Sequence, residues 1–381
     1  EFRRVLFRSS SREQLRELVA NSPVQRVYVV AWRDRDDPEA GGSELHADEV
    51  LRRWAAAGLD ITLRTSGIEG GARRIDRHGY HVRREHGRYR IFFQVLRERR
   101  KVRREADAVV EIWNGMPFWS PLWFRGPRSV WLHHVHGEMW QMTLPGLLGR
   151  IGWAIESRLA PRFYQRSNIT TLSLSSREEI ADRLGLEADV VSPGISDFYC
   201  PGPTRESTPL VVAVGRLVPV KRFDALMRAF MEVRRDIPSA RLVIAGEGYL
   251  RDELENLRRE LGGEEAISLP GRVSDEELRS LYQRAWVTSS ASLREGWGMS
   301  LTEAAACGCP VVATNIAGHR DAVRQGQSGV LCTLEELPHQ LHRVLADDTL
   351  RHELSAGSLA LAHELTWDNT ALRLYEKLLG R

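Results

Sequence analysis

Two glutamates, Glu295 and Glu303, stand in a stretch whose pattern could bind an anion. The stretch covers residues 294–318 and reads REGWGMSLTEAAACGCPVVATNIAG. Glycines come first, a helix is predicted over 300–307, and a strand is predicted over 311–314. A helix that begins beside a glycine turn offers backbone N–H groups and the positive end of its dipole to a group such as a diphosphate. The stretch therefore predicts an anion site with carboxylates beside it.

The same residues also allow a simpler interpretation. Ser300 and Glu303 have the spacing of a capping box, in which each side chain bonds the backbone of the other residue at the start of a helix. Taken alone, that pattern favours a purely structural role for Glu303. The glycines at 296 and 298, the spacing of the two glutamates and the ending CGCPVV together favour the anion site.

Two cations follow another predicted strand, over 210–214. Arg216 stands at the strand tip after Gly215, and Lys221 stands just before a helix predicted over 223–235. Cations at the end of a strand and at the start of its helix can both reach a diphosphate. The alternative, two unrelated surface cations, fits this strand-to-helix context less well.

The first half of the chain predicts a strand–helix–strand unit of its own. A strand over 26–32, a helix opened by Gly41 and Gly42, and a strand over 60–64 have the order of the first repeat in a doubly wound sheet. A glycine pair is weak evidence by itself, because helix caps use glycine routinely.

Three histidines, His133, His134 and His136, follow a strand predicted over 129–132. Their spacing suits no single ligand face, and no carboxylate pattern accompanies them, so we expect no metal site there.

Together these motifs resemble the donor site of the retaining nucleotide-sugar glycosyltransferases of family four, which have the GT-B fold. The likeness covers nearly the whole chain after its start and is most specific over 210–318. It implies an α/β protein with two doubly wound, Rossmann-like domains facing a cleft. It also implies transfer of a sugar from a nucleoside diphosphate sugar to a hydroxyl with retention of configuration. By the same resemblance no metal or other cofactor is needed, and UDP or GDP carries the sugar.

The resemblance assigns roles to individual residues. Glu295 contacts the transferred sugar, Glu303 accepts hydrogen bonds from the ribose, and Arg216 with Lys221 holds the diphosphate. His133 occupies the position of a histidine beside the donor sugar, with His134 as the alternative. The implied catalytic residues are His133, Glu295, Arg216 and Lys221. The implied donor-binding residues are Gly41, Gly42, Gly215, Arg216, Lys221, Gly246, Arg272, Val273, Glu295, Gly296, Trp297, Gly298, Met299, Ser300, Leu301 and Glu303.

Asp34 and Asp36 spell D-x-D, the metal signature of the other main glycosyltransferase fold. We interpret this segment as an acidic surface loop, because it follows the first strand directly and the donor motif belongs to a metal-independent class. Cys307 and Cys309 lack zinc spacing and a second ligand pair, so we expect reduced thiols.

Charge is distributed unevenly along the chain. Residues 1–205 carry 33 Lys and Arg against 26 Asp and Glu, whereas the remaining residues carry 21 against 25. The surplus indicates that the first half meets something anionic or has a solvated arginine-rich surface. The basic end of a helix predicted over 91–105 has the pattern of a solvated helix end, which is what charge runs usually are, and contact with lipid headgroups or a phosphorylated acceptor is the functional interpretation. No apolar run reaches the roughly 18 residues of a membrane span. We therefore expect a cytoplasmic protein, peripheral on the inner face of the membrane if the basic helix binds lipid.

We expect the following organisation of the chain. Residues 1–21, which include the adaptor-like sequence RRVLFRS, form a disordered start, and residues 22–200 form an N-terminal, acceptor-side domain. Residues 201–209 form a linker, residues 210–365 a C-terminal nucleotide-sugar-binding domain, and residues 366–381 a helix that crosses back to the N-terminal domain.

The expected function is synthesis of a cell-envelope glycolipid or polysaccharide on a lipid-linked or saccharide acceptor, with no binding of nucleic acid. One alternative is a GT-B nucleotide-sugar epimerase, which the spacing of Glu295 and Glu303 disfavours. A catalytically degenerate partner subunit is another, disfavoured by the intact Arg216 and Lys221. A dinucleotide oxidoreductase is disfavoured because no G-x-G-x-x-G follows the first strand.

Overall fold

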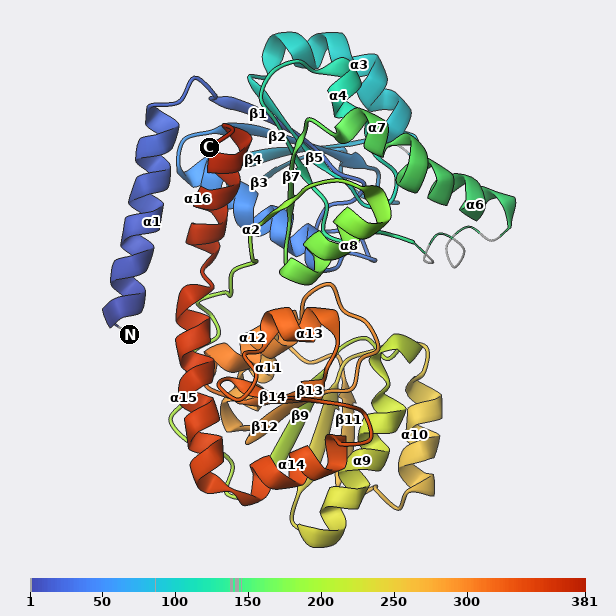
Figure 1. Cartoon of the computed structure of the whole chain (residues 1–381), viewed down its shortest axis with the longest axis vertical. Helices are drawn as coiled ribbons and strands as arrows, with labels where there is room; N and C mark the ends of the chain where they lie inside the picture. The colour runs from blue at the N-terminus through green and yellow to red at the C-terminus, as the bar shows by residue number, and fades with distance from the viewer. Residues whose placement is uncertain (1, 86, 138–139, 141–143, 145) are drawn as a thin grey trace. The chain divides into compact units, whose positions relative to one another are not determined.

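The computed structural model describes residues 2–85, 87–137, 140, 144 and 146–381. The chain divides into two compact units. The first unit runs to Gly194 and also includes Thr366–Arg381, and the second unit is Ile195–Leu365. Each unit has its own largely parallel sheet with helices around it (Figure 1). The two-domain α/β architecture predicted from the sequence is thereby confirmed.

Within the described residues, eight strands form the sheet of the first unit, in the order β3-β4-β2-β1-β5-β6-β7-β8. All neighbours pair in parallel except β3 and β4, which are antiparallel. The central strands are apolar and buried along their length, as expected when helices cover both faces of a parallel sheet. The strands are β1 (Arg26–Val30), β2 (Asp60–Ser66), β3 (Arg74–Arg77), β4 (Tyr80–Glu85), β5 (Ala108–Ile112), β6 (Arg128–Trp131), β7 (Asn168–Thr171) and β8 (Asp189–Val190).

The helices of the first unit include two that frame the site described below, α2 and α16. The described helices are α1 (Phe2–Ala20), α2 (Gly42–Ala56), α3 (Ile91–Glu105), α4 (Ser120–Trp123), α6 (Leu147–Ala154), the π-helical turn η1 (Ile155–Leu159), α7 (Pro161–Tyr164), α8 (Leu174–Leu184) and α16 (Trp367–Leu378).

The sheet of the second unit has the order β11-β10-β9-β12-β13-β14, with all neighbours parallel. The order reverses between β9 and β12, and ligands of such sheets bind at this point, outside the carboxyl ends of the strands. The strands are β9 (Leu210–Val214), β10 (Arg241–Ala245), β11 (Ile267–Gly271), β12 (Val287–Ser290), β13 (Val311–Thr314) and β14 (Gly329–Cys332). The helices are η2 (Pro219–Lys221), α9 (Phe223–Asp236), α10 (Arg251–Glu260), α11 (Asp275–Arg284), α12 (Met299–Ala306), α13 (Ala317–Ala322), α14 (Leu337–Ala346) and α15 (Asp348–Glu364).

The start of the chain differs from the expected disordered segment. Helix α1 packs along α16 within the first unit, and Leu15 and Val19 on it are each 2% exposed. Residues four apart share one face of a helix, so these two side chains are buried together. Arg12 adds an ion pair of 2.9 Å to Asp368 of α16.

The linker expected at 201–209 also differs, because these residues belong to the second unit. Glu206 pairs with Arg241 at 2.8 Å and with Arg284 at 3.1 Å. The Arg205 guanidinium donates to the carbonyl oxygens of Ala285 and Gly308. These long-range contacts fix a segment whose composition alone is typical of a linker.

Among the described residues, no helix combines the length and the apolar character that crossing a membrane would require.

Candidate functional site

The second unit brings two predicted residues together where the order of its strands reverses. Lys221 ends η2, after β9, and Glu295 lies in the loop after β12. The Lys221 Nζ atom forms an ion pair with Glu295 Oε1, and the Ser292 hydroxyl donates a hydrogen bond of 2.8 Å to the same oxygen. The two charged side chains are 20% and 19% exposed, so both remain accessible to a charged ligand.

Arg216 lies in a loop that backbone contacts hold in place. The Gly215 N–H donates to the Ala245 carbonyl at 3.1 Å. Gly246 has a φ of +151°, and a Cβ there would lie 2.9 Å from the Gly215 carbonyl carbon, so only glycine fits. Within the described residues the exposed Arg216 makes no hydrogen bond or ion pair. Its guanidinium is therefore available to an anion.

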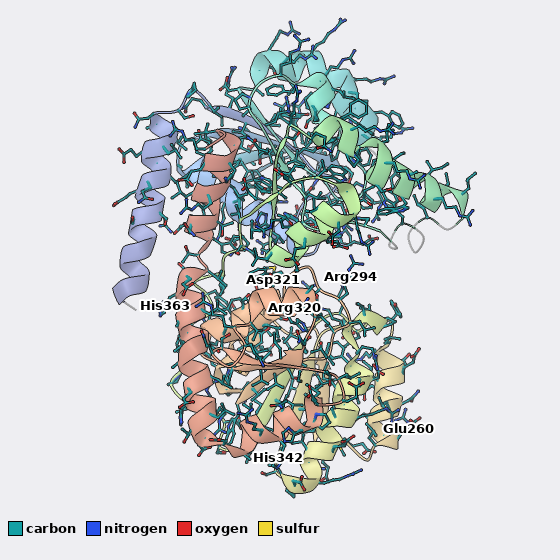
Figure 2. All side chains as sticks on the ribbon, in the orientation of Figure 1. Glu260, Arg294, Arg320, Asp321, His342 and His363 are labelled. Atoms are coloured by element: carbon teal, nitrogen blue, oxygen red, sulfur yellow. The ribbon has the colours of Figure 1, made fainter. Side chains whose placement is uncertain are left out.

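The loops after β10 and β11 meet at the same edge of the sheet. The Gly246 N–H donates to the Gly271 carbonyl oxygen at 2.8 Å. The next residue, Arg272, is exposed and Val273 is partly buried. Figure 2 labels Arg294, Arg320 and Asp321 at the end of the second unit opposite His342. Arg294 directly precedes Glu295 in the chain.

The expected capping box at Ser300 and Glu303 is wrong. Helix α12 begins at Met299, its N-cap is Gly298, and no side chain caps it. Ser300 therefore lies inside the first turn, where its side chain cannot act as the N-cap. The first turn still presents backbone N–H groups and the positive end of the helix dipole.

The Glu303 side chain is instead partly buried. Burial, reinforced by the nearby Asp275 carboxylate, raises the pKa of Glu303 to about 8, and the Tyr282 hydroxyl opposes the shift. A carboxyl group that the fold keeps out of water without a cation is a frequent sign of a ligand-binding role.

Two residues of the predicted donor set are part of the core. Trp297 is 8% exposed and Leu301 is 1% exposed, and both pack in a cluster with Val311, Val323 and Met299. Their side chains position the start of α12, so only their backbone groups could contact a donor.

Helix α13 packs against the loop that carries Glu295. A Cβ at Gly318 would lie 2.8 Å from the Glu295 carbonyl carbon and would overlap its oxygen. Thr314 donates a hydrogen bond of 2.7 Å to the Ser292 carbonyl. His319 Nδ1 lies 2.8 Å from the Thr314 carbonyl oxygen, and burial lowers the pKa of His319. A neutral His319 that donates from Nδ1 satisfies this geometry.

In the first unit, His133 lies after β6 in a closely packed aromatic group. It is 3% exposed, and neither ring nitrogen has a hydrogen-bond partner within the described residues. The His46 ring meets it edge to face, with centroids 4.8 Å apart. Burial, with smaller contributions from His46 and His134, lowers the pKa of His133 well below its usual value. His133 is therefore neutral, and both of its ring nitrogens are buried. Its contact with a donor sugar stays a prediction.

Gly41 and Gly42 lie at the start of the helix that carries His46. Gly41 is the N-cap of α2, and its N–H donates a hydrogen bond of 2.8 Å to the buried carboxylate of Glu44. Arg33 Nε lies 3.4 Å from the other Glu44 oxygen. The predicted glycine pair therefore forms the start of α2, which the contacts of Glu44 hold in place. His134, the alternative to His133, stacks on His136 with centroids 5.0 Å apart.

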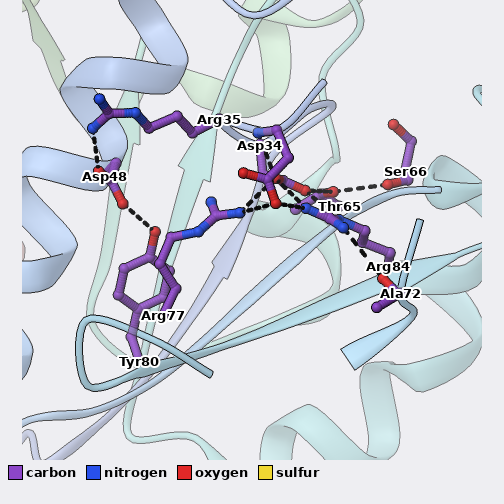
Figure 3. A network of polar contacts seen from close by, with 10 residues as sticks. Asp34, Arg35, Asp48, Thr65, Ser66, Ala72, Arg77, Tyr80 and Arg84 are labelled. Atoms are coloured by element: carbon purple, nitrogen blue, oxygen red, sulfur yellow. Dashed lines mark hydrogen bonds and ion pairs between the residues drawn. The ribbon is translucent and has the colours of Figure 1, made fainter. Parts of the chain in front are cut away.

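The D-x-D segment is an internal ion-pair network, which Figure 3 shows. The Asp34 side chain is fully buried, and Arg84 Nη2 lies 2.7 Å from it. Arg84 and Arg77 also reach Asp36, at 2.6 Å and 2.5 Å. Burial by itself would raise the pKa of Asp34, but the hydrogen bonds from Arg84 and from the Asp36 N–H, together with the charges of Arg84 and Arg77, outweigh burial and lower it. The segment therefore matches the expected surface loop only in part: Asp36 is exposed, but Asp34 is buried, and two arginines from β3 and β4 pair with both carboxylates.

Among the described residues, no group of three or more His, Cys, Asp or Glu side chains is placed to hold a metal ion. Metal independence of the reaction stays a prediction.

Two family models match adjoining parts of the chain. Residues 201–358 match the model of glycosyl transferases group 1, and residues 40–197 match that of glycosyltransferase family 4. A curated relative from Nocardiopsis dassonvillei is 30% identical over 64% of this chain and 69% of its own length. The chain belongs to glycosyltransferase family 4.

Several curated relatives share one name, D-inositol 3-phosphate glycosyltransferase. The relative from Nocardioides is 26% identical over 93% of this glycosyltransferase and 89% of its own length. The relative from Acidothermus cellulolyticus is 33% identical over 53% of this chain. The chain spans about half the length of that relative and of several others, 50% in the Acidothermus case.

Solved structures share the fold of this glycosyltransferase. Sucrose-phosphate synthase from Thermosynechococcus elongatus gives a TM-score of 0.75 at 17% identity, over 93% of this chain and 99% of that one. HepE of Anabaena, in complex with UDP and glucose, gives 0.72 at 17% identity, over 94% and 100%. At these identities the likeness establishes the GT-B fold and no more.

Several residues that support this glycosyltransferase site were missed in the sequence. Ser292 lies just after a strand and Thr314 is the last residue of one, and these positions are the signal that the sequence gives for them. His46 and His319 lie inside helices, where a single histidine has no distinctive pattern. Their roles depend on contacts between elements.

Two glycines beside Glu295 predict opposite outcomes for the same substitution. Gly318→Ala should lower the free energy of unfolding by about 2–3 kcal/mol, because the added methyl group overlaps the Glu295 backbone. Gly296→Ala should melt normally, because the space around that position is open. If a donor occupies this space, Gly296→Ala should raise the donor KM several-fold. Thermal melting and donor kinetics of both variants check this, and equal melting temperatures would contradict the predicted overlap.

Proposed function

We propose that this protein transfers a sugar from a nucleoside diphosphate sugar to a hydroxyl acceptor, with retention and without a metal ion. The observation that carries the proposal is the ion pair of Lys221 with Glu295 in the second unit. The Lys221 Cε would lie 3.2 Å from a Cβ at Gly215, the residue before Arg216, and α12 begins four residues after Glu295. A diphosphate needs cations and N–H donors, and a sugar needs a carboxylate that accepts its hydroxyls. Both requirements are met at one edge of one sheet.

In this proposal the diphosphate is the leaving group, and negative charge develops on it as the sugar departs. Arg216, Lys221 and the α12 dipole stabilise that charge. Lys221 can contact the diphosphate while it remains beside Glu295, so the ion pair also orients the carboxylate toward the sugar. The family resemblance also assigns His133 to the transferred sugar, and this assignment stays a prediction. No residue is assigned as a covalent nucleophile, and the leaving phosphate accepts the proton of the acceptor on the same face.

UDP or GDP is proposed as the nucleotide, and a lipid-linked or saccharide molecule of the cell envelope as the acceptor. The presence of UDP in solved structures of the same fold supports a nucleotide-sugar donor. The name shared by the curated relatives supports a hydroxylated acceptor that carries a phosphate.

Thermal-shift screening with UDP, GDP and ADP sugars tests the donor site, because a site-specific ligand raises the melting temperature by mass action. NMR of the product formed from the stabilising donor then gives the reaction and the anomeric configuration. Formation of an isomerised nucleotide sugar without acceptor would establish an epimerase instead. Binding without turnover over a panel of glycolipid and saccharide acceptors would favour a degenerate subunit.

Activity is expected to survive excess EDTA, because Arg216 and Lys221 supply the positive charge at the diphosphate. The measurement is the initial rate with and without EDTA after dialysis. Loss of activity in EDTA with rescue by Mn²⁺ would contradict the proposal. Asp34→Asn should destabilise the fold, since it removes the buried carboxylate charge that pairs with Arg84 and leaves the exposed Asp36 as the carboxylate that pairs with it among the described residues.

We also propose that α3 contacts anionic lipid through its basic end. Arg97, Arg99 and Arg100 are exposed or partly exposed, and the Phe93 ring beside them is 72% exposed. Binding to anionic vesicles should therefore weaken as salt rises, by about 1 kcal/mol for each cation engaged. A variant with these arginines changed to Gln should bind less tightly at low salt. Equal binding of variant and parent would show that this face is only solvated.

A further inference from the structure

An exposed apolar stripe runs along the helical segment from Leu147 to Tyr164 in the first unit. The segment is continuous through α6, η1 and α7, because Ala160 between η1 and α7 is itself helical. Leu147, Leu148, Ile151, Leu159 and Phe163 are 71%, 61%, 45%, 42% and 40% exposed. Such side chains are rare on a monomer surface when they gather on one element.

The spacing of these residues makes them one stripe. Residues 147, 151, 155, 159 and 163 are each four apart, and Ile155 is partly buried between the exposed ones. In an α-helix, residues four apart drift slowly around the axis, because a turn takes about 3.6 residues. The Ala160 N–H bonds the Ile155 carbonyl at 2.8 Å, an i→i+5 bond. This wider turn counteracts the drift and keeps the stripe on one side.

The charge beside the stripe has a single sign. Arg150, Arg158, Arg162 and Arg166 are all exposed, and none makes an ion pair within the described residues. The only acidic residue over 146–167 is Glu156, which is fully buried. An apolar stripe flanked by cations, with no exposed acid, is the composition of a helix that lies in a membrane interface.

The opposite face of the segment is held firmly to the first unit. Glu156 accepts hydrogen bonds from the His136 N–H at 3.0 Å and from Trp140 Nε1 at 2.7 Å. The Tyr164 hydroxyl donates to the buried Glu111 at 2.7 Å. A Cβ at Gly152 would lie 2.7 Å from the Trp140 ring. The buried face therefore already has its partners, and only the stripe lacks one in the described part of the chain.

We propose that α6, η1 and α7 dock the protein onto an anionic lipid bilayer, with the apolar stripe inserted between the headgroups. The arginines would then lie at the level of the lipid phosphates, where long basic side chains reach the charged layer. Apolar side chains of a neighbouring element, α4 and the residue before it, lie beside the stripe or are exposed. Trp119 beside α4 contacts Phe163 at 5.7 Å between ring centroids, and Leu122 of α4 is 56% exposed. Figure 1 shows α6 extending outward from the first unit.

This inference is separate from the contact proposed for α3, because it depends on apolar insertion and not on charge alone. It also does not require the sugar-transfer reaction, so vesicle binding tests it directly.

The test uses the full chain and sedimentation with vesicles of phosphatidylcholine containing phosphatidylglycerol. The stripe variant combines Leu147→Ser, Ile151→Ser and Leu159→Ser. The matched control combines Leu174→Ser and Tyr249→Ser, which remove side chains that are 53% and 75% exposed elsewhere. The stripe variant should bind at least about tenfold more weakly than the parent, at low and at high salt. The control should bind like the parent, and all three proteins should melt alike.

A charge variant separates the two parts of the contact. Changing Arg158 and Arg162 to Gln should weaken binding at low salt by about fivefold for each engaged arginine, and should change little at high salt. Equal binding of the stripe variant and the parent would overturn the proposal, as would failure of the parent to bind vesicles. If the parent instead self-associates through the stripe, analytical ultracentrifugation would show a dimer that the stripe variant loses, and the proposal would be wrong.

Discussion

Replacing Lys221 by Met is expected to lower kcat/KM for the donor by about 10²–10³-fold, the usual effect of removing one group that stabilises developing charge. The structure adds a second reason for a large effect. Lys221 is the ion-pair partner of Glu295, so its loss leaves the Glu295 carboxylate with the Ser292 hydrogen bond alone. Glu295→Gln should lower kcat by a comparable factor, because its contact is to the reacting sugar.

The coupling between these two residues makes the prediction specific. The double variant should be much less impaired than the product of the two single effects, since each single change already breaks the same pair. Arg228→Gln is the matched control, because it removes an exposed cation of α9 in the same unit and should leave kcat/KM within about twofold. Near-normal turnover in Lys221→Met would show that Lys221 does not bind the diphosphate, whatever the effect of the substitution on stability.

Glu303→Gln is expected to raise the donor KM by about 10–100-fold, corresponding to hydrogen bonds to a charged group of about 1.5–3 kcal/mol. Since the helix has no side-chain cap, the substitution cannot act by removing one. The ionised carboxylate accepts ribose hydroxyls better than the protonated acid does. Donor affinity of the parent should therefore increase as pH rises through about 8, and affinity of the variant should not. Normal donor binding by Glu303→Gln would show that the ribose assignment is wrong.

The same residue predicts a change in stability with pH. The pKa of Glu303 is raised to about 8 in the folded protein, against an ordinary value near 4.3 in an unfolded chain. The folded state therefore binds the extra proton between these values, and its contribution to stability is full below the unfolded pKa and is lost as pH rises through 8. Gln does not titrate. The free energy of unfolding of the variant should therefore rise relative to that of the parent as pH rises from 6 to 9. Each tenfold change in the proton-dissociation constant corresponds to about 1.4 kcal/mol, so a gain of roughly 1–3 kcal/mol is expected by denaturant unfolding.

Patterns of neighbouring residues predicted many of the helices, strands and loop positions. The helix at α12 and the strand β13 follow from a glycine turn, an Ala-rich run and a β-branched run that neighbouring residues specify. The placement of Arg216 and Lys221 follows because residues after parallel strands gather at one edge of the sheet. The family resemblance added the roles of Glu295 and Glu303, which spacing alone leaves open.

Local patterns failed where a contact between distant segments decided the outcome. Asp34 and Asp36 have the sequence of an exposed acidic loop, but Asp34 is buried and pairs with Arg77 and Arg84 from another part of the chain, whereas Asp36 stays exposed. Ser300 and Glu303 have the spacing of a capping box, but the packing of Trp297 and Leu301 starts the helix at Met299.

The sequence by itself thus determined the fold class, the strand-to-helix turns and the residue types available for a sugar nucleotide. Only the tertiary structure decided which of those residues meet. Lys221 pairs with Glu295, and His46 packs on His133, although the members of each pair are far apart in the chain. The physical reason is that hydrophobic periodicity and turn chemistry are properties of a few consecutive residues. Ion pairs, burial and the pKa values that follow from burial depend on elements brought together by the whole fold.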